Sequence, residues 1–284
     1  MARGRRRPLI FSVLILLSLV VAAYAAVVAS MWHQQERLLF PSYMVAPAGP
    51  LPPGAERLGL DTADGVRLEG LHIPARAGRS SDTLLLVFAG NGSNAQGVAE
   101  IVHQLQPDHD VAAFFYRGYA PSGGIAAAQA LTEDAPLVHD LLVRRYRPGR
   151  IVAVGVSLGS GVAAALAARR PLAGAILVTP FDSLAATGGQ LYPWLPVSLL
   201  FRHDINSAEL LRGSSVPVAI IAAGDDRLVR PERTDALRDA VGRLVFDATL
   251  PGARHNDILV HPDFESAMKE ALTHMRIQRD NSLT

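Results

Sequence analysis

The chain contains no cysteine, and this absence excludes several kinds of site. Without a thiol there is no disulfide framework, no thiolate nucleophile, no cysteine-ligated zinc and no iron–sulfur cluster. The nine histidines show none of the short spacings typical of zinc-binding helices. Glycine (24) and proline (19) are near average usage, which excludes collagen-like and low-complexity chains. We therefore expect no metal site.

Charge is also scarce and unevenly placed. Charged residues make up 19% of the chain, and no acidic residue precedes Glu36. Four of the 27 basic residues lie within the first seven positions, so the rest of the chain is slightly acidic against its 26 carboxylates. A slightly acidic body without a basic stripe binds nucleic acid poorly, and we expect no nucleic-acid partner.

The longest uncharged stretch lies near the N-terminus. Leu9 to Met31 is a 23-residue run without a charged side chain. At ~1.5 Å per residue such a helix is about 35 Å long, enough to cross a bilayer core of ~30 Å. The sequence predicts a transmembrane anchor over 9–31, with the arginine-rich segment 1–8 in the cytoplasm and the rest on the extracytoplasmic side.

A cleaved signal peptide is the alternative interpretation of this segment. Ala23-Tyr24-Ala25 has the small-x-small form of a cleavage site, and Leu9 to Val21 has the length of a signal-peptide apolar region. The apolar run continues past that site to Trp32 and His33, which resemble an interfacial edge. We therefore favour an uncleaved anchor; either alternative exports the body.

The remaining chain alternates between strand and helix patterns. Residues 32–55 are predicted to be a linker, and 56–284 a single catalytic domain that opens with a β-hairpin over 57–73. Continuous apolar runs then predict strands buried on both faces, with helices between them. The strand runs are Thr83–Phe88, Val111–Phe115, Ile151–Val156, Ala175–Val178, Val218–Ala222 and Leu244–Phe246, and the helices are expected over 94–105, 127–146, 158–169, 232–241 and 262–276. This alternation predicts an α/β fold with a mostly parallel, doubly wound sheet. The stretch 181–215 breaks the rhythm and is predicted to form a short cap insertion.

One glycine-flanked serine occupies a strand-to-helix junction. Gly155-Val156-Ser157-Leu158-Gly159 follows an apolar strand and precedes an alanine-rich helix. This G-x-S-x-G pattern in that setting is typical of a nucleophile elbow, in which a strained turn exposes the serine hydroxyl. Gly155 and Gly159 are expected to face each other across the turn, where side chains would collide. Ser157 is the candidate nucleophile.

A serine nucleophile needs a base, and the base needs an acid to orient it. In this arrangement the acid and then the histidine follow the serine along the chain. Asp226 is the predicted acid because it begins an Asp-Arg-Leu-Val turn, with Asp225 as the alternative. His255, in the loop after the last strand, is the predicted base, and His261 is its nearest competitor.

Two backbone amides are candidates for an oxyanion hole. Leu158 follows the nucleophile and opens the next helix, so its N–H points toward the position where negative charge develops. The second donor is expected from Ala89-Gly90-Asn91-Gly92, after the first buried strand, with Asn91 N–H as the candidate. Arg117-Gly118-Tyr119 either lines the site or forms an ordinary structural turn.

Seven motifs in this order resemble α/β-hydrolase superfamily serine hydrolases, specifically the single-pass membrane-anchored group. That group includes depalmitoylases, lysophospholipases and prolyl-oligopeptidase-like bacterial relatives. The motifs are Gln35-Glu36-Arg37-Leu38-Leu39-Phe40-Pro41, Gly90-Asn91-Gly92, Tyr116-Arg117-Gly118-Tyr119, Gly155-x-Ser157-x-Gly159, Tyr192-Pro-x-Leu-Pro196, Asp226-x-x-Val229 and Gly252-x-x-His255-Asn256-Asp257. The family usually has His-Gly before the oxyanion asparagine, whereas Ala89 stands here in place of that histidine.

The resemblance implies a Ser157–Asp226–His255 triad, hydrolysis through an acyl-enzyme and no cofactor. Expected substrates are small-molecule or lipid acyl esters and thioesters, with the membrane as partner through the N-terminal helix. Two alternatives remain: a serine peptidase of prolyl-oligopeptidase type, and a non-catalytic membrane-tethered interaction protein that kept the fold. The replacement at Ala89 implies that the oxyanion loop is held in a different way.

Overall fold

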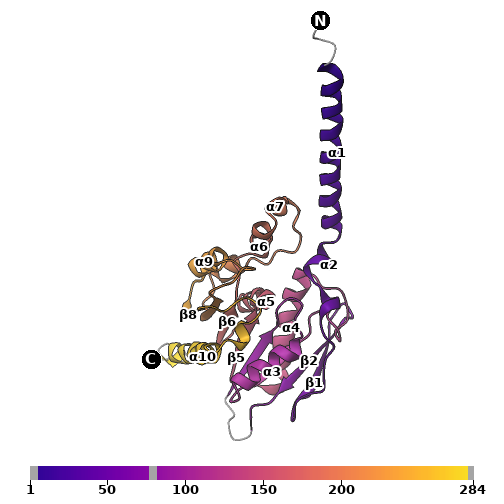
Figure 1. Ribbon diagram of the computed structural model, residues 1–284. Coiled ribbons are helices and arrows are strands. Elements are labelled where there is room, and N and C mark those ends of the chain that lie inside the picture. Colours follow the sequence, from indigo (N-terminus) through magenta and orange to yellow (C-terminus); the bar gives the residue numbers. More distant parts are fainter. Residues whose placement is uncertain (1–5, 77–81, 281–284) are drawn as a thin grey trace.

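A computed structural model describes residues 6–76 and 82–280 and contains one eight-stranded sheet (Figure 1). The strand order is β1-β2-β4-β3-β5-β6-β7-β8. The β1–β2 and β2–β4 pairs are antiparallel and every other neighbouring pair is parallel. The strands are β1 (Glu56–Asp61), β2 (Arg67–Ile73), β3 (Thr83–Phe88), β4 (Asp110–Phe114), β5 (Arg150–Val156), β6 (Gly174–Val178), β7 (Val218–Ala223) and β8 (Leu244–Leu250). The predicted mostly parallel α/β sheet is confirmed.

The apolar strand runs are buried on both faces because helices cover both sides of the sheet. In β3, Leu84 and Leu86 pack into one core, whereas Leu85 and Val87 pack into the other. The first core is covered by α4, α5, α8 and α9, and the second by α3 and α10. These helices are α3 (Ala95–Leu105), α4 (Ala128–Tyr146), α5 (Leu158–Ala167), α8 (Ser207–Arg212), α9 (Pro231–Ala240) and α10 (Phe264–Asp280), with a 3-10 turn η2 (Ile258–Val260) before α10. This layering brings the loops at the carboxyl ends of the strands to one edge.

The chain leaves this layered body between β6 and α8 to form a cap. Two short helices lie in the excursion, α6 (Leu184–Leu191) and α7 (Val197–Leu200). An antiparallel bridge between Ser183 and Asn206 closes its base. The excursion itself is therefore 184–205, and α8 belongs to the helix layer.

The N-terminal helix α1 (Arg6–His33) projects away from the body (Figure 1). Its apolar part, Ile10–His33, is long enough to cross a membrane and is not buried by the body, so α1 is a candidate transmembrane helix. The segment predicted as a linker begins with α2 (Gln35–Leu39) and a 3-10 turn η1 (Ser42–Met44). We call the contacts between residues 24–40 and 192–203 the junction; they include Gln35 Nε2 donating to the Leu200 carbonyl at 2.8 Å and Arg202 stacking over Trp32 at 4.7 Å.

Candidate active site

Ser157 lies at the sharp turn between β5 and α5. Its φ of 51° and ψ of −115° place a residue with a side chain in a region that usually favours glycine, and such strain is typical of functional turns. A Cβ on Gly155 would lie 2.3 Å from the Gly159 carbonyl oxygen, and one on Gly159 would lie 2.1 Å from that of Phe88. Both positions therefore require glycine: Gly155 faces Gly159 across the turn, whereas Gly159 faces the end of β3.

A chain of hydrogen bonds joins three residues that lie far apart in the sequence. His255 Nε2 lies 2.8 Å from Ser157 Oγ, and His255 Nδ1 lies 2.7 Å from Asp226 Oδ2. The second oxygen of Asp226 accepts the backbone N–H groups of Leu228 and Val229, each at 2.9 Å. The side chains of His255 and Asp226 are only 9% and 4% exposed, so bulk water screens their interaction weakly.

Asp225 and His261, the alternatives to Asp226 and His255, lie outside this chain of hydrogen bonds. Asp225 has an exposed side chain, and its backbone N–H donates to the Ala253 carbonyl at 2.8 Å. This bond ties the loop that carries Asp226 to the loop that carries His255. His261 Nε2 lies 3.2 Å from the Pro251 carbonyl oxygen, outside the hydrogen-bonded chain.

The Gly90–Gly92 loop after β3 lies beside the serine. A Cβ on Gly90 would be 3.7 Å from the Ser157 Cβ. Leu158 is the first residue of α5, so its N–H has no carbonyl one turn earlier to bond. The two candidate amides, on Asn91 and Leu158, therefore belong to segments that flank Ser157.

The side chain of Asn91 fixes this loop in a way that the sequence reasoning missed. Its Oδ1 accepts a hydrogen bond from the Tyr119 hydroxyl at 2.6 Å, and its Nδ2 donates to the Leu39 carbonyl. The Tyr116 hydroxyl donates to the Ala89 carbonyl at 2.8 Å. Burial raises the pKa of both tyrosines, so their hydroxyls remain protonated donors. The loop thus has its own supports where the family histidine is missing.

The only signal for this support in the sequence was the Tyr-Arg-Gly-Tyr motif itself. Arg117, between the two tyrosines, forms an ion pair with Asp134 at 2.7 Å and a second with Asp64. These partners hold the turn, which favours the structural role that the sequence left as one of two alternatives for Arg117. Within 6–76 and 82–280, no group of three His, Asp or Glu side chains is arranged to hold a metal ion.

Comparison with known proteins identifies relatives over most of the chain, although no family model matches it. An uncharacterized protein of Mycobacterium tuberculosis is 36% identical over 256 residues, which are 84% of this chain and 89% of the relative. An uncharacterized membrane protein of Saccharomyces cerevisiae is 27% identical over 89% of this chain and 93% of the relative. The lysophosphatidylserine lipase ABHD12 of Danio rerio is 26% identical over 68% of this chain and 59% of that lipase.

Solved structures with the same fold include hydrolases. An esterase of Pyrococcus furiosus superposes with a TM-score of 0.64 at 21% identity, covering 81% of this chain and 95% of the esterase. A bacterial membrane phospholipase A superposes with a TM-score of 0.57 at 14% identity, covering 95% of this chain and 99% of the phospholipase. The sheet order and these relatives lead to one assignment: the chain belongs to the α/β-hydrolase superfamily, and it carries a candidate transmembrane helix near its N-terminus.

Proposed function

We propose that this protein is a membrane-anchored serine hydrolase that cleaves carboxylic esters or thioesters through an acyl-enzyme. Ser157 is the nucleophile, His255 the base and Asp226 the acid that orients the base. The observation that carries this proposal is the continuous chain of hydrogen bonds, 2.8 Å from Ser157 Oγ to His255 and 2.7 Å from His255 to Asp226.

In the first half-reaction, Ser157 Oγ attacks the substrate carbonyl carbon while His255 Nε2 takes the hydroxyl proton. Asp226 accepts the Nδ1–H of His255, which holds the ring in the tautomer that leaves Nε2 free as a base. The backbone N–H groups of Leu158 and Asn91 donate to the oxyanion of the tetrahedral intermediate, each contributing ~3 kcal/mol. When the intermediate collapses, His255 returns the proton to the departing alcohol or thiol.

In the second half-reaction, a water molecule attacks the acyl carbon of the Ser157 ester. His255 takes a proton from this water, and the same two amides stabilise the second oxyanion. Collapse releases the carboxylic acid as the proton returns to Ser157 Oγ. Water is the only co-reactant, and the enzyme returns to its starting state.

We also propose that the anchor is retained and that the body lies on the extracytoplasmic side. The Tyr24 hydroxyl, inside the possible cleavage sequence, donates to the Trp194 carbonyl of the cap at 2.8 Å. Cleavage after Ala25 would remove this contact. The intact mass of the membrane-extracted protein should therefore include residues 1–25, and protease added outside spheroplasts should digest the body.

A fluorophosphonate probe tests the proposed nucleophile directly. The full-length protein in phosphatidylcholine vesicles should be labelled, and Ser157→Ala should not be. Ser266→Ala, on the exposed surface of α10, is the matched control and should label like the parent protein. A folded parent protein that resists the probe would instead support the non-catalytic interaction protein.

A substrate panel separates the remaining alternatives. Oxygen esters, thioesters and peptide amides with the same acyl group should be compared under the same conditions. We expect hydrolysis of esters or thioesters; preferential cleavage after proline in peptides would favour the peptidase alternative.

A further inference from the structure

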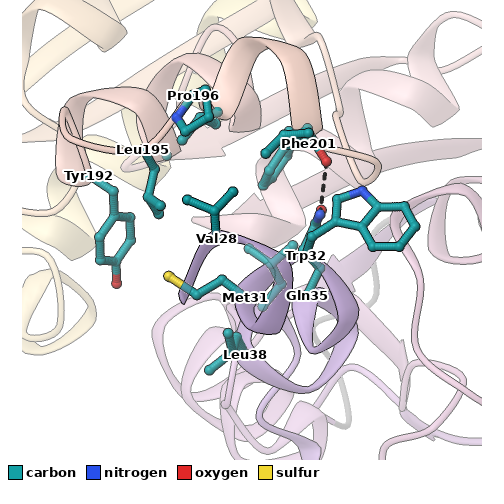
Figure 2. Close-up of a pocket in the computed structure, with 13 residues that line it drawn as sticks. Val28, Met31, Trp32, Gln35, Leu38, Tyr192, Leu195, Pro196 and Phe201 are labelled. Atoms are coloured by element: carbon teal, nitrogen blue, oxygen red, sulfur yellow. Dashed lines mark hydrogen bonds between the residues drawn. The ribbon is translucent and has the colours of Figure 1, made fainter. Parts of the chain in front are cut away.

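A hollow separates the cap from the end of the N-terminal helix (Figure 2). Its volume is about 190 Å³. Val28, Met31 and Leu38 form one wall, and Leu195, Val197 and Phe201 of the cap form the other. The lining is almost entirely apolar. Gln35 is polar, but its side chain is already used, since Nε2 donates to the Leu200 carbonyl and Oε1 accepts the Arg202 N–H at 3.1 Å.

The position of the hollow along α1 relates it to the bilayer. Tyr24 lies seven residues before Met31, about 10 Å further along the helix toward the membrane interior. Because Tyr24 bonds the Trp194 carbonyl, the tip of the cap reaches this level as well. Trp194 and Leu199 are 52% and 83% exposed there, as suits side chains in the interfacial layer of a membrane. A membrane crossed by α1 would therefore also meet the cap.

Leu39 connects the lining of the hollow to the loop beside the candidate active site. Leu39 lines the hollow, and its carbonyl accepts the hydrogen bond from Asn91 Nδ2. Asn91 in turn belongs to the loop beside Ser157. A residue of the lining thus contacts the loop predicted to hold the oxyanion.

We propose that this hollow binds one acyl chain of a bilayer lipid, which enters from the side of the membrane. At roughly 30 Å³ for each water-sized group, the space holds about six methylenes, so the rest of the chain stays in the bilayer. An apolar lining without a free charge suits a methylene chain and excludes a charged headgroup. Binding of the chain does not depend on the proposed hydrolase function. Only one consequence rests on that function, namely that the bound chain presents its ester to Ser157.

Photocrosslinking tests binding without requiring turnover. The probe is a phosphatidylcholine with a diazirine midway along one palmitoyl chain, mixed into phosphatidylcholine vesicles that contain the full-length Ser157→Ala protein. We expect mass spectrometry to find adducts on Val197 and Phe201. Leu199, exposed on the same short helix, provides the internal reference for general contact with lipid.

Blocking the hollow supplies the decisive comparison. Val28→Trp fills it from α1, whereas Val27→Trp adds the same side chain at a neighbouring position that is 47% exposed and outside the lining. Crosslinking at Val197 and Phe201, relative to Leu199, should fall about fivefold in Val28→Trp and stay unchanged in Val27→Trp. Gly188→Leu, which fills the hollow from α6 next to Val197, should repeat the loss if Val28→Trp disturbs α1. An unchanged ratio in both filled variants would overturn the proposal.

Activity separates the failure of this proposal from the failure of the proposed function. In proteins that retain Ser157, the rate ratio of palmitoyl to butyryl ester hydrolysis should fall about 10-fold or more in Val28→Trp and stay unchanged in Val27→Trp. If the parent protein hydrolyses no ester but the crosslinks behave as expected, the hollow binds lipid and only the proposed function fails. If both esters are hydrolysed and their ratio is unchanged in the filled variants, the acyl-chain site fails and the hydrolase stands.

Discussion

Backbone contacts hold Ser157 at the carboxyl edge of the sheet, whereas side chains hold the cap against α1. At the edge, a Cβ added to Gly155 or Gly159 would lie only 2.3 Å or 2.1 Å from a backbone carbonyl oxygen, so the turn has no room for either side chain. At the junction, a few hydrogen bonds and one cation–π contact join segments about 170 residues apart. The edge is therefore expected to be rigid, and the junction to tolerate substitution and movement.

The comparison predicts the largest change when the reacting group itself is removed. Ser157→Ala should lower kcat by ~10³-fold or more, because the remaining site supplies only binding and oxyanion stabilisation. The melting temperature should stay close to that of the parent protein. Steady-state hydrolysis of a soluble ester and a thermal melt measure the two effects, with Ser266→Ala as control. Residual activity above a tenth of the parent value would contradict the assignment.

The next largest effect separates two neighbouring carboxylates. Asp226→Asn should lower kcat by ~10²-fold or more, because the amide favours the wrong tautomer of His255. Asp225→Asn should change kcat less than about threefold, since that side chain is exposed at the rim. The same kinetic assay compares both variants. If Asp225→Asn caused the larger loss, the acid assignment would be wrong.

A smaller effect concerns the packing that holds the serine turn. Gly159→Ala should destabilise the protein by about 1–3 kcal/mol, because its Cβ would force the turn away from β3. Gly97→Ala, inside α3 with no atom within 4 Å of the added Cβ, should instead be neutral or stabilising by up to ~1 kcal/mol. Denaturant unfolding measures both. Equal stability of the two variants would show that the edge is less rigid than the contacts indicate.

The smallest effect is expected at the junction, in its response to acid. His203 is buried there, with Nε2 4.0 Å from Glu36 Oε1; burial lowers the pKa of His203, Arg202 lowers it further and Glu36 opposes this shift. The unfolded chain therefore binds more protons below about pH 6.5, and the stability of the folded state falls as the pH falls from there.

Replacing His203 should flatten this dependence. The drop in melting temperature between about pH 6.5 and 5 should be smaller in His203→Gln than in the parent protein, because the buried imidazole no longer resists protonation. His274→Gln, at an exposed position on α10, is the matched control. An identical pH dependence in His203→Gln and the parent protein would show that His203 does not cause the loss of stability in acid.

The same contrast explains what could be predicted from the sequence. Strand runs such as Thr83–Phe88 and the serine turn are encoded locally, by continuous apolar residues and by paired glycines. The order serine, aspartate, histidine narrowed the candidates, and the Asp-Arg-Leu-Val turn favoured Asp226 over Asp225. In the fold, His255 lies within 2.8 Å of both Ser157 and Asp226.

What remained hidden depends on contacts between distant side chains. Nothing near Ala89 reveals that Tyr119 and the Leu39 carbonyl hold the asparagine of the loop. Likewise, the apolar pattern around Tyr24 indicates a membrane segment but not its bond to the cap. Such pairings form only when the chain folds, because neither segment of a pair specifies which residue it will meet.

The bridge between Ser183 and Asn206 has a consequence for how this architecture diversifies. Because the excursion starts and ends at two paired residues, its length and composition are free to change while β6 and α8 stay in register. Mutation and recombination can thus exchange one cap for another without altering the sheet edge that carries the candidate active site. The same two positions are suitable boundaries for grafting caps from other members of the superfamily.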